Sequence, residues 1–148
     1  MNIEIRVKAQ FSSRVARARL TRIARKTLRA EKVDVALTIY VTDDAEIRKM
    51  NRVFHGTDAP TDVLAFPLLE GRSIERPYTK RPYLGDIIIS YDRAHVQAHA
   101  AGWRIADELD LLAVHGILHL LGYDDVTPRK RAKMWKRQEE ILGREIKG

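Results

Sequence analysis

Hydrophobic residues recur along the chain with two different periods. Apolar side chains alternate with polar ones at 2–8 and 33–41, and shorter apolar runs occupy 63–68 and 85–90, which predicts four strands. Helical spacing occurs at 12–30, 43–54, 91–101 and 109–121, and a last helix is expected after Thr127. This order predicts a single α/β domain over residues 1–148, in which a four-stranded mixed β-sheet packs with about five helices.

The segment 109–125, LDLLAVHGILHLLGYDD, has apolar residues all around a helical wheel, so a helix here would be buried. His115 and His119 stand four residues apart and therefore share one face of that helix. Gly122 can end the helix in a left-handed conformation, and two aspartates follow it. Because a buried polar group needs a partner, we interpret the segment as a divalent metal site made by both histidines and one carboxylate.

Two other interpretations of this segment are open from the residues alone. Histidine pairs of this spacing also occur without metal, with backbone or carboxylate partners. The spacing also matches zincin peptidases, but Gly116 occupies the position of their catalytic glutamate, so a peptidase here lacks its general base. A second pair, His95 and His99, has the same spacing in a polar, alanine-rich segment, and we interpret these two as surface histidines.

Composition narrows the chemistry and the partners. The 148 residues include no cysteine, so His and carboxylate side chains, rather than thiolates, would hold a metal. The net charge of +7 and the isoelectric point near 9.9 favour a polyanionic partner. No apolar run reaches the roughly 18 residues of a membrane span, and no signal peptide is evident, so we expect a cytoplasmic protein without a membrane partner. The oligomeric state is not indicated.

Basic residues are concentrated in two predicted helices and one loop. No acid balances the bases between 12 and 30, where Arg22, Arg25 and Arg29 fall on one stripe of the helical wheel. Arg129 and Arg131 begin a basic run directly after the predicted metal site. These arginines are candidates for contacts with RNA phosphates, and the alternative is a solvated helix face. A long loop at 70–83 adds Arg72, Arg76, Lys80 and Arg81.

Two sequence motifs resemble those of one family. HGILHLLGYDD at 115–125 resembles the HGxLHLxGxDH motif of the YbeY-type endoribonucleases, and NRVFHGTDAPTDVLAFP at 51–67 resembles their NxxYRGxDxPTDVLSFP. LGDIIIS at 84–90 fits the family's next strand, so the resemblance covers most of the chain from 43 to 138. It implies a zinc-dependent, single-strand-specific endoribonuclease that matures the 3′ end of small-subunit ribosomal RNA and acts in ribosome quality control. The implied partners are ribosomal RNA and the small ribosomal subunit.

The chain departs from the family motifs at two positions that concern the site. The family's third metal-binding histidine is Asp125 here, so the role of this carboxylate rests on its chemistry. Asp124 matches a family aspartate that orients a ligand rather than binding the metal. His55 replaces an arginine that the family uses for activity. It is a candidate for contacting a phosphate or shuttling a proton, and the alternative is a residue that caps the loop.

Three functions are compatible with these observations. The leading hypothesis is metal-assisted RNA cleavage, with one zinc ion per chain at His115, His119 and Asp125; a carboxylate ligand also admits another divalent transition metal. The second is a ribosome-associated RNA-binding factor with little nuclease activity, which the replaced arginine and histidine suggest. The third is a zincin-like metallopeptidase, which the glycine at position 116 disfavours.

Overall fold

The computed structural model describes residues 1–68 and 82–146. Its elements are β1 (Asn2–Val7), the 3-10 helix η1 (Ala9–Phe11), α1 (Arg17–Ala30), β2 (Ala36–Thr42), α2 (Asp44–His55), β3 (Val63–Pro67), β4 (Tyr83–Ser90), α3 (Tyr91–Ala101), α4 (Ile105–Leu120) and α5 (Pro128–Leu142). The basic side chains predicted at 72, 76, 80 and 81 lie outside the described residues.

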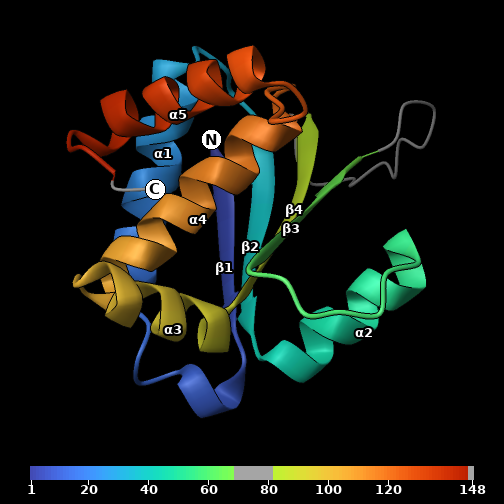
Figure 1. Ribbon diagram of the computed structural model, residues 1–148. Coiled ribbons are helices and arrows are strands. Elements are labelled where there is room, and N and C mark those ends of the chain that lie inside the picture. The colour runs from blue at the N-terminus through green and yellow to red at the C-terminus, as the bar shows by residue number, and fades with distance from the viewer. Residues whose placement is uncertain (69–81, 147–148) are drawn as a thin grey trace.

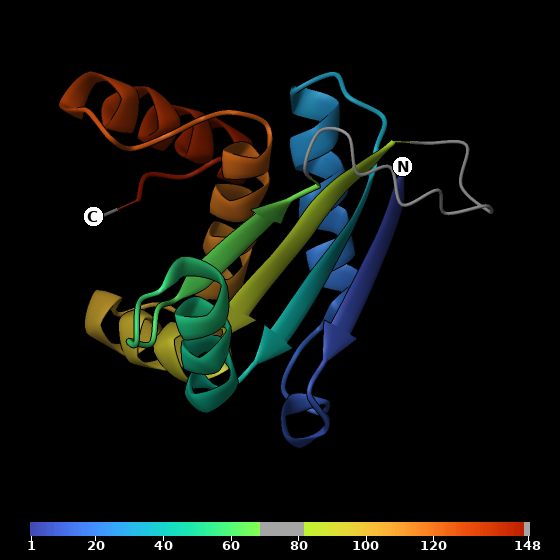
Figure 2. The same cartoon turned by 90° about the vertical axis from the view of Figure 1, so that its right-hand side faces the viewer.

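The strands of the described residues form one mixed sheet in the order β1-β2-β4-β3. β1, β2 and β4 are parallel, and β3 runs antiparallel to β4 at the edge. Figure 1 shows α1 and α4 on one face of the sheet and α2 on the other, and Figure 2 shows the strands in their order from β1 to β3. The predicted α/β class, with a mixed four-stranded sheet and five α-helices in the described residues, is confirmed.

α4 lies at the centre of the core and is buried on nearly every side, as predicted. One side packs in a cluster that includes Leu109, Leu112, Ala113 and Ile117 of α4 with Ile87 and Ile89 of β4. Another side packs against α5, where Val114 and Leu118 contact Met134 and Ile141. Although it is apolar, α4 has only 16 residues, and no helix in the described part of the chain is long and apolar enough to cross a membrane.

Gly116 lies where α4 packs closely on Ile87 of β4. A Cβ added there would be 2.7 Å from Cγ2 of Ile87, which is too close for any side chain unless Ile87 or the helix shifts. A glutamate, which zincin peptidases carry at this position, therefore does not fit. The packing of α4 on β4 gives a structural reason why the peptidase general base is missing.

The start of α1 differs from the prediction. The helix begins at Arg17 rather than at the serines at 12 and 13, and no side chain caps its first turn. Phe11 is buried and its ring stacks on Tyr91, with centroids 4.5 Å apart. This contact with α3 holds the segment before α1 in a 3-10 turn, so a tertiary contact overrides the local capping signal of the serines.

The start of β2 also differs, because the chain first completes the end of α1. Lys32 has a φ of 57°, and the N–H of Val33 donates to the carbonyl of Leu28 at 3.0 Å. A hydrogen bond of this kind closes a helix end, so it removes that N–H from the sheet. β2 consequently begins at Ala36, although the alternation of apolar residues starts at 33.

Two predicted helix caps are present, one of them in a modified form. Asp43 accepts the N–H of Glu46 at 2.8 Å and so caps α2. Glu46 does not reach back to complete a capping box, because its carboxylate accepts hydrogen bonds from the hydroxyls of Tyr40 and Thr42 in β2. Thr127 caps α5, which begins with proline as predicted.

Candidate metal centre

α4 and the turn after it bring the three predicted metal ligands together. His115 and His119 point the same way from successive turns, and their Nε2 atoms are 3.0 Å apart. Gly122, with a φ of 103°, turns the chain beyond the helix so that Asp125 comes back toward the histidines. One ligand atom from each of the three side chains lies within 4.8 Å of the others. The three donors therefore surround one small site.

Gln138 of α5 fixes the orientation of His115. Its Oε1 lies 2.6 Å from Nδ1 of His115, and its side chain is fully buried. An amide oxygen only accepts hydrogen bonds, so Nδ1 carries the hydrogen and Nε2 keeps its lone pair. That lone pair is on the side of His119, where a metal would bind. A hydrogen bond of this kind orients metal-binding histidines and raises their basicity.

Gln138 was not predicted as a site residue from the sequence. It lies 23 residues after His115 in the chain, and a single glutamine in a charged helix carries no signal of its own. The available signal is its spacing, because positions 134, 138 and 141 share one helix face and the other two, Met134 and Ile141, are apolar. A polar residue on a buried face requires a partner, and here that partner is His115.

The electrostatics of His115 suit a metal ligand. Burial lowers the pKa of this imidazole below its ordinary value. The hydrogen bond to Gln138 and the negative charges of Asp62 and Asp125 raise the pKa of His115 by less, and the neighbouring His119 lowers it further. His115 is therefore neutral at neutral pH, which is the form of imidazole that coordinates a metal.

The two aspartates after the helix have different surroundings. The carboxylate of Asp124 accepts the N–H of Val126 at 3.1 Å and pairs with Lys130 at 3.3 Å, and these contacts lower its pKa. Asp124 is thus engaged within its own turn, whereas the exposed Asp125 is the carboxylate grouped with the histidines. Two imidazole nitrogens and a carboxylate oxygen, without a thiolate, form a donor set that fits a divalent transition metal.

Known proteins are similar to this chain over most of its length. A family model described as Endoribonuclease YbeY matches residues 2–145. Endoribonuclease YbeY of Roseiflexus castenholzii is 42% identical over 144 residues, which cover 95% of this chain and 91% of the relative. Endoribonuclease YbeY of Chloroflexus aggregans is 47% identical over 131 residues, which cover 84% of each chain.

The chain belongs to the YbeY endoribonuclease family. The resemblance inferred from the two motifs is confirmed, and with it the assignment to hydrolases that cleave RNA internally. The solution structure of TM1509 from Thermotoga maritima is similar with a TM-score of 0.60 at 28% identity, covering 95% of this chain and 89% of that one. YbeY enzymes are metal-dependent nucleases, and the group of three on α4 and its following turn is compatible with metal binding.

In the YbeY motif, an arginine stands where this chain has His55. This residue ends α2, is exposed, and stacks its ring on Phe66 of β3 with the centroids 5.4 Å apart. Phe66 packs against a cluster of Ile47, Leu64 and Ile88 on the face of the sheet that α2 covers. The structure therefore places His55 on the α2 side of the edge strand, and its role toward RNA stays a prediction.

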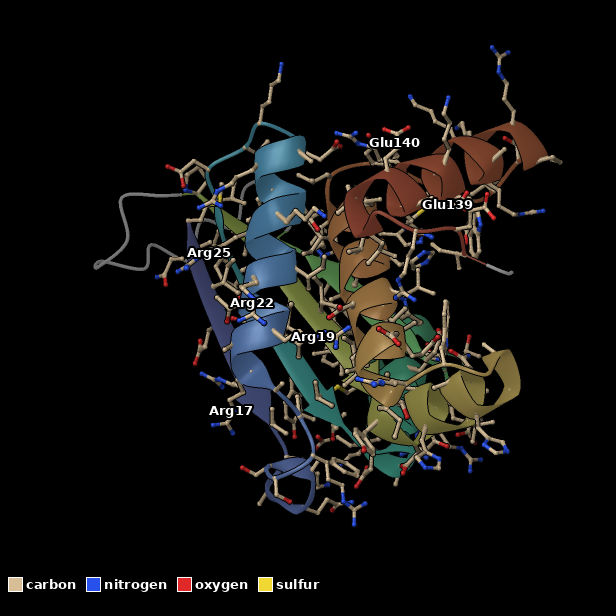
Figure 3. The ribbon with its side chains drawn as sticks, turned by 90° about the vertical axis from the view of Figure 1, so that its left-hand side faces the viewer. Arg17, Arg19, Arg22, Arg25, Glu139 and Glu140 are labelled. Atoms are coloured by element: carbon tan, nitrogen blue, oxygen red, sulfur yellow. The ribbon has the colours of Figure 1, made fainter. Side chains whose placement is uncertain are left out.

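The arginines predicted to contact RNA are all exposed: Arg22, Arg25 and Arg29 on α1, and Arg129 and Arg131 on α5. Figure 3 shows Arg22 and Arg25 along the outer side of α1, whereas Arg19 points toward α4. Arg19 pairs with Asp107 and Asp110 at 2.8 and 2.9 Å, so α4 supplies acids that the sequence of α1 itself lacks. The RNA contacts of the exposed arginines stay a prediction.

The α5 arginines are close to the candidate metal centre. Nη2 of Arg131 lies 3.4 Å from the backbone carbonyl of Asp125, and Lys130 beside it pairs with Asp124. The first turn of α5 thus places cations next to the turn that carries the candidate carboxylate ligand. Arg19 of α1, by contrast, pairs with Asp107 and Asp110 of α4, which lie one to two helical turns before His115.

Proposed function

We propose that this protein is a zinc-dependent endoribonuclease that cleaves single-stranded RNA, that its substrate is ribosomal RNA of the small subunit, and that it acts in the cytoplasm. The convergence of His115, His119 and Asp125, with Gln138 holding one histidine in its metal-binding form, is the observation that carries the proposal. Family membership supports an RNA substrate, and the net charge of +7 is suited to a polyanion.

The chain's own residues have separate tasks in this proposal. His115, His119 and Asp125 would hold the metal and leave one coordination position open. A zinc ion held by these residues would supply Lewis acidity, which makes water more acidic and polarises a phosphate oxygen. Gln138 keeps Nε2 of His115 unprotonated, and Asp124 stabilises the turn that presents the carboxylate ligand.

Cations around the site would position the RNA backbone. Arg129 and Arg131 begin α5 beside the carboxylate turn and would contact the phosphates nearest the cleaved linkage. Arg22, Arg25 and Arg29 would hold more distant phosphates along α1. His55 would contact a phosphate or transfer a proton from the far side of β3, where it takes the place of the family's arginine.

Cleavage of a defined RNA tests the proposal. The metal-stripped protein is given zinc, manganese or magnesium with a single strand that carries the precursor 3′ end of small-subunit ribosomal RNA, or with the same strand annealed to its complement. We expect metal-dependent cleavage of the single strand only, its loss in His119→Ala, and its retention in the matched His99→Ala. If every RNA remains intact while the protein holds one metal per chain, the proposal is wrong.

Charge reversal distinguishes the two basic surfaces. Arg129→Glu with Arg131→Glu should weaken RNA binding more than Arg22→Glu with Arg25→Glu, because the first pair lies beside the carboxylate turn. Each lost phosphate contact should also reduce the slope of log affinity against log salt by about one. Exposed charges contribute little to folding, so both double variants should have nearly the same unfolding midpoint as the parent protein.

A second candidate function is an RNA-binding factor with little nuclease activity. The position of His55 on the α2 side of β3, in place of the family's arginine, favours it. This alternative expects RNA affinity that survives chelation of the metal together with absent cleavage. Loss of RNA affinity on metal removal, from a protein that stays folded, would argue against it.

A further inference from the structure

A cavity of about 380 Å³ opens beside His115, on the same side of α4 as the candidate metal ligands. Its walls come from the residue before β3, from α3 and the turn after it, from α4, and from α5 with the residues that follow it. The lining residues that matter to its chemistry are Asp62, Trp103, Glu108, His115, Trp135 and Gln138. The two tryptophans are the only ones in the sequence, so both indoles of the protein face one cavity.

In the described part of the chain, the amide of Gln138 leaves its NH2 group without a hydrogen-bond partner at this cavity. Its oxygen accepts from His115, but its Nε2 is buried and has no partner among the described residues. A buried donor that stays unpaired costs about 1–3 kcal/mol, so this N–H group is placed for a ligand acceptor. The side chain is fully buried, so its position is fixed before any ligand arrives.

Glu108 supplies the opposite kind of group, from a position on α4 about two helical turns before His115. It is only 4% exposed and lies beside Trp103, and burial raises the pKa of its carboxyl group. A ligand that donates hydrogen bonds to Glu108 compensates for this burial. Asp62 adds a further acidic group at the same cavity. The cavity therefore offers the buried donors of Gln138 and Trp103, acidic acceptors and two aromatic walls.

These features match a nucleobase better than a phosphate. A base is planar, stacks on aromatic side chains, and carries both donors and acceptors on its edge. A phosphate would be repelled by the two carboxylates, and it is better held by the cations at the start of α5. Because His115 is at once a wall of the cavity and a candidate metal ligand, a base in the cavity belongs to a nucleotide next to the reacting linkage.

We propose that this cavity receives one unstacked base of the RNA strand beside the cleaved linkage, and that it prefers bases with an exocyclic amino group. This inference rests on the proposed function. Adenine, cytosine and guanine present an amino group to the carboxylate of Glu108, and uracil does not. A paired base cannot enter without leaving its stack, so the cavity also explains a preference for single strands.

Nucleotide binding to the metal-stripped, full-length protein tests this directly. Both tryptophans line the cavity, so their fluorescence, corrected for absorption by the added nucleotide, reports its occupancy. AMP, CMP, GMP and UMP are titrated separately, and we expect saturable quenching that is weakest for UMP. Glu108→Gln should weaken binding of the amino-bearing nucleotides about tenfold, since one hydrogen bond to a charged group is altered. The matched control is Glu140→Gln, an acid of α5 (Figure 3) that pairs with Arg137 and does not line the cavity.

A second variant keeps the test decisive if Glu108→Gln folds poorly. Ala101 is an exposed residue of the cavity wall at the end of α3, so Ala101→Leu should obstruct the cavity without disturbing the core. We expect it to reduce binding of all four nucleotides and to change which linkages are cut in RNA. The inference is overturned if no nucleotide quenches the fluorescence, or if both variants bind nucleotides and choose linkages as the parent does.

The outcome also separates this inference from the proposed function. Metal-dependent RNA cleavage without nucleotide quenching would leave the nuclease in place and remove the base site. Saturable nucleotide binding that responds to Glu108→Gln and Ala101→Leu, in a protein that cleaves no RNA, would support the base site and remove the nuclease.

Discussion

On α3 and on α4, two histidines stand four residues apart, yet the two pairs have opposite surroundings. His95 and His99 are both exposed on α3, a helix of mostly small and polar residues. On α4 the rings are part-buried, in contact with each other, and joined by Gln138 from α5 and a carboxylate from the next turn. Spacing puts two side chains on one face, but residues from other elements decide whether that face has a chemical use.

The position after the first histidine shows the same contrast. On α3 it is Val96, whose side chain is 62% exposed. On α4 it is Gly116, where an added Cβ would meet Ile87 of the sheet. A helix that is fixed against the sheet holds its histidines in place, which is the preorganisation that a metal site requires.

Removing one histidine from each pair should give the largest difference. Loss of a residue that only supports a metal ligand lowers metal affinity by at most about 100-fold. His119→Ala removes a ligand itself, so it should lower metal affinity by more than this. His99→Ala on α3 should leave the metal content at the parent value. Elemental analysis of the purified proteins after dialysis measures both. Equal metal in the two variants would mean that the α4 pair has no special role.

Loss of the carboxylate ligand should have the second-largest effect on metal affinity. Asp125→Ala should lose most of the metal, Asp125→His should keep or raise zinc affinity, and Asp124→Ala should cost less than either ligand loss. The reason is that Asp125 groups with the histidines, whereas Asp124 is engaged by Val126 and Lys130. Zinc titration against a competing chelator gives the affinities. Full metal in Asp125→Ala with loss in Asp124→Ala would reverse the assignment.

Gln138 should have an intermediate effect. Gln138→Leu removes the acceptor that holds Nδ1–H of His115, so zinc affinity should fall by about 10–100-fold. Gln138→Glu keeps an oxygen acceptor at the same place and should recover most of that affinity. The unfolding midpoint of each metal-free variant separates this role from a packing role. If the glutamate variant binds zinc as weakly as the leucine variant, Gln138 only fills space.

The general architecture of the protein was predictable because alternation and helical spacing are local properties. The four strands, the buried helix and the caps at Asp43 and Thr127 are confirmed. The boundaries that moved did so through contacts between distant segments, as when the ring of Phe11 stacks on Tyr91 and delays α1. Such contacts leave no mark in a short window of sequence, so the pattern misplaces the ends of elements more readily than their existence.

The candidate site was predictable to a similar extent. His115, His119 and Asp125 lie within 11 residues of one helix and turn, and the structure brings them together as expected. Gln138 and Glu108 were missed as functional residues because each acquires its meaning from a partner on another element. The ligands of a compact motif can be inferred from spacing, whereas the groups that orient them and the cavity beside them require the fold.

The smallest effect is expected at Gly116 of α4, where a substitution changes the packing of the helix and no metal ligand. Alanine in place of glycine inside a helix gains roughly 0.5–1 kcal/mol of stability, because glycine has more backbone freedom to lose. At Gly116 the new Cβ would lie 2.7 Å from Cγ2 of Ile87, and overpacking of a core costs about 1–3 kcal/mol. The second effect is larger, so Gly116→Ala should lower the free energy of unfolding by about 1–2 kcal/mol.

Urea unfolding of the metal-free protein measures this change, with Val96→Ala as the matched control. Val96 holds the equivalent place on α3 and is exposed, so its replacement should change the free energy of unfolding by no more than about 0.5 kcal/mol. A Gly116→Ala protein that is as stable as the parent would show that the contact with Ile87 can adjust without cost. The packing argument against a glutamate at position 116 would then fail, and the absence of a peptidase base would rest on the sequence alone.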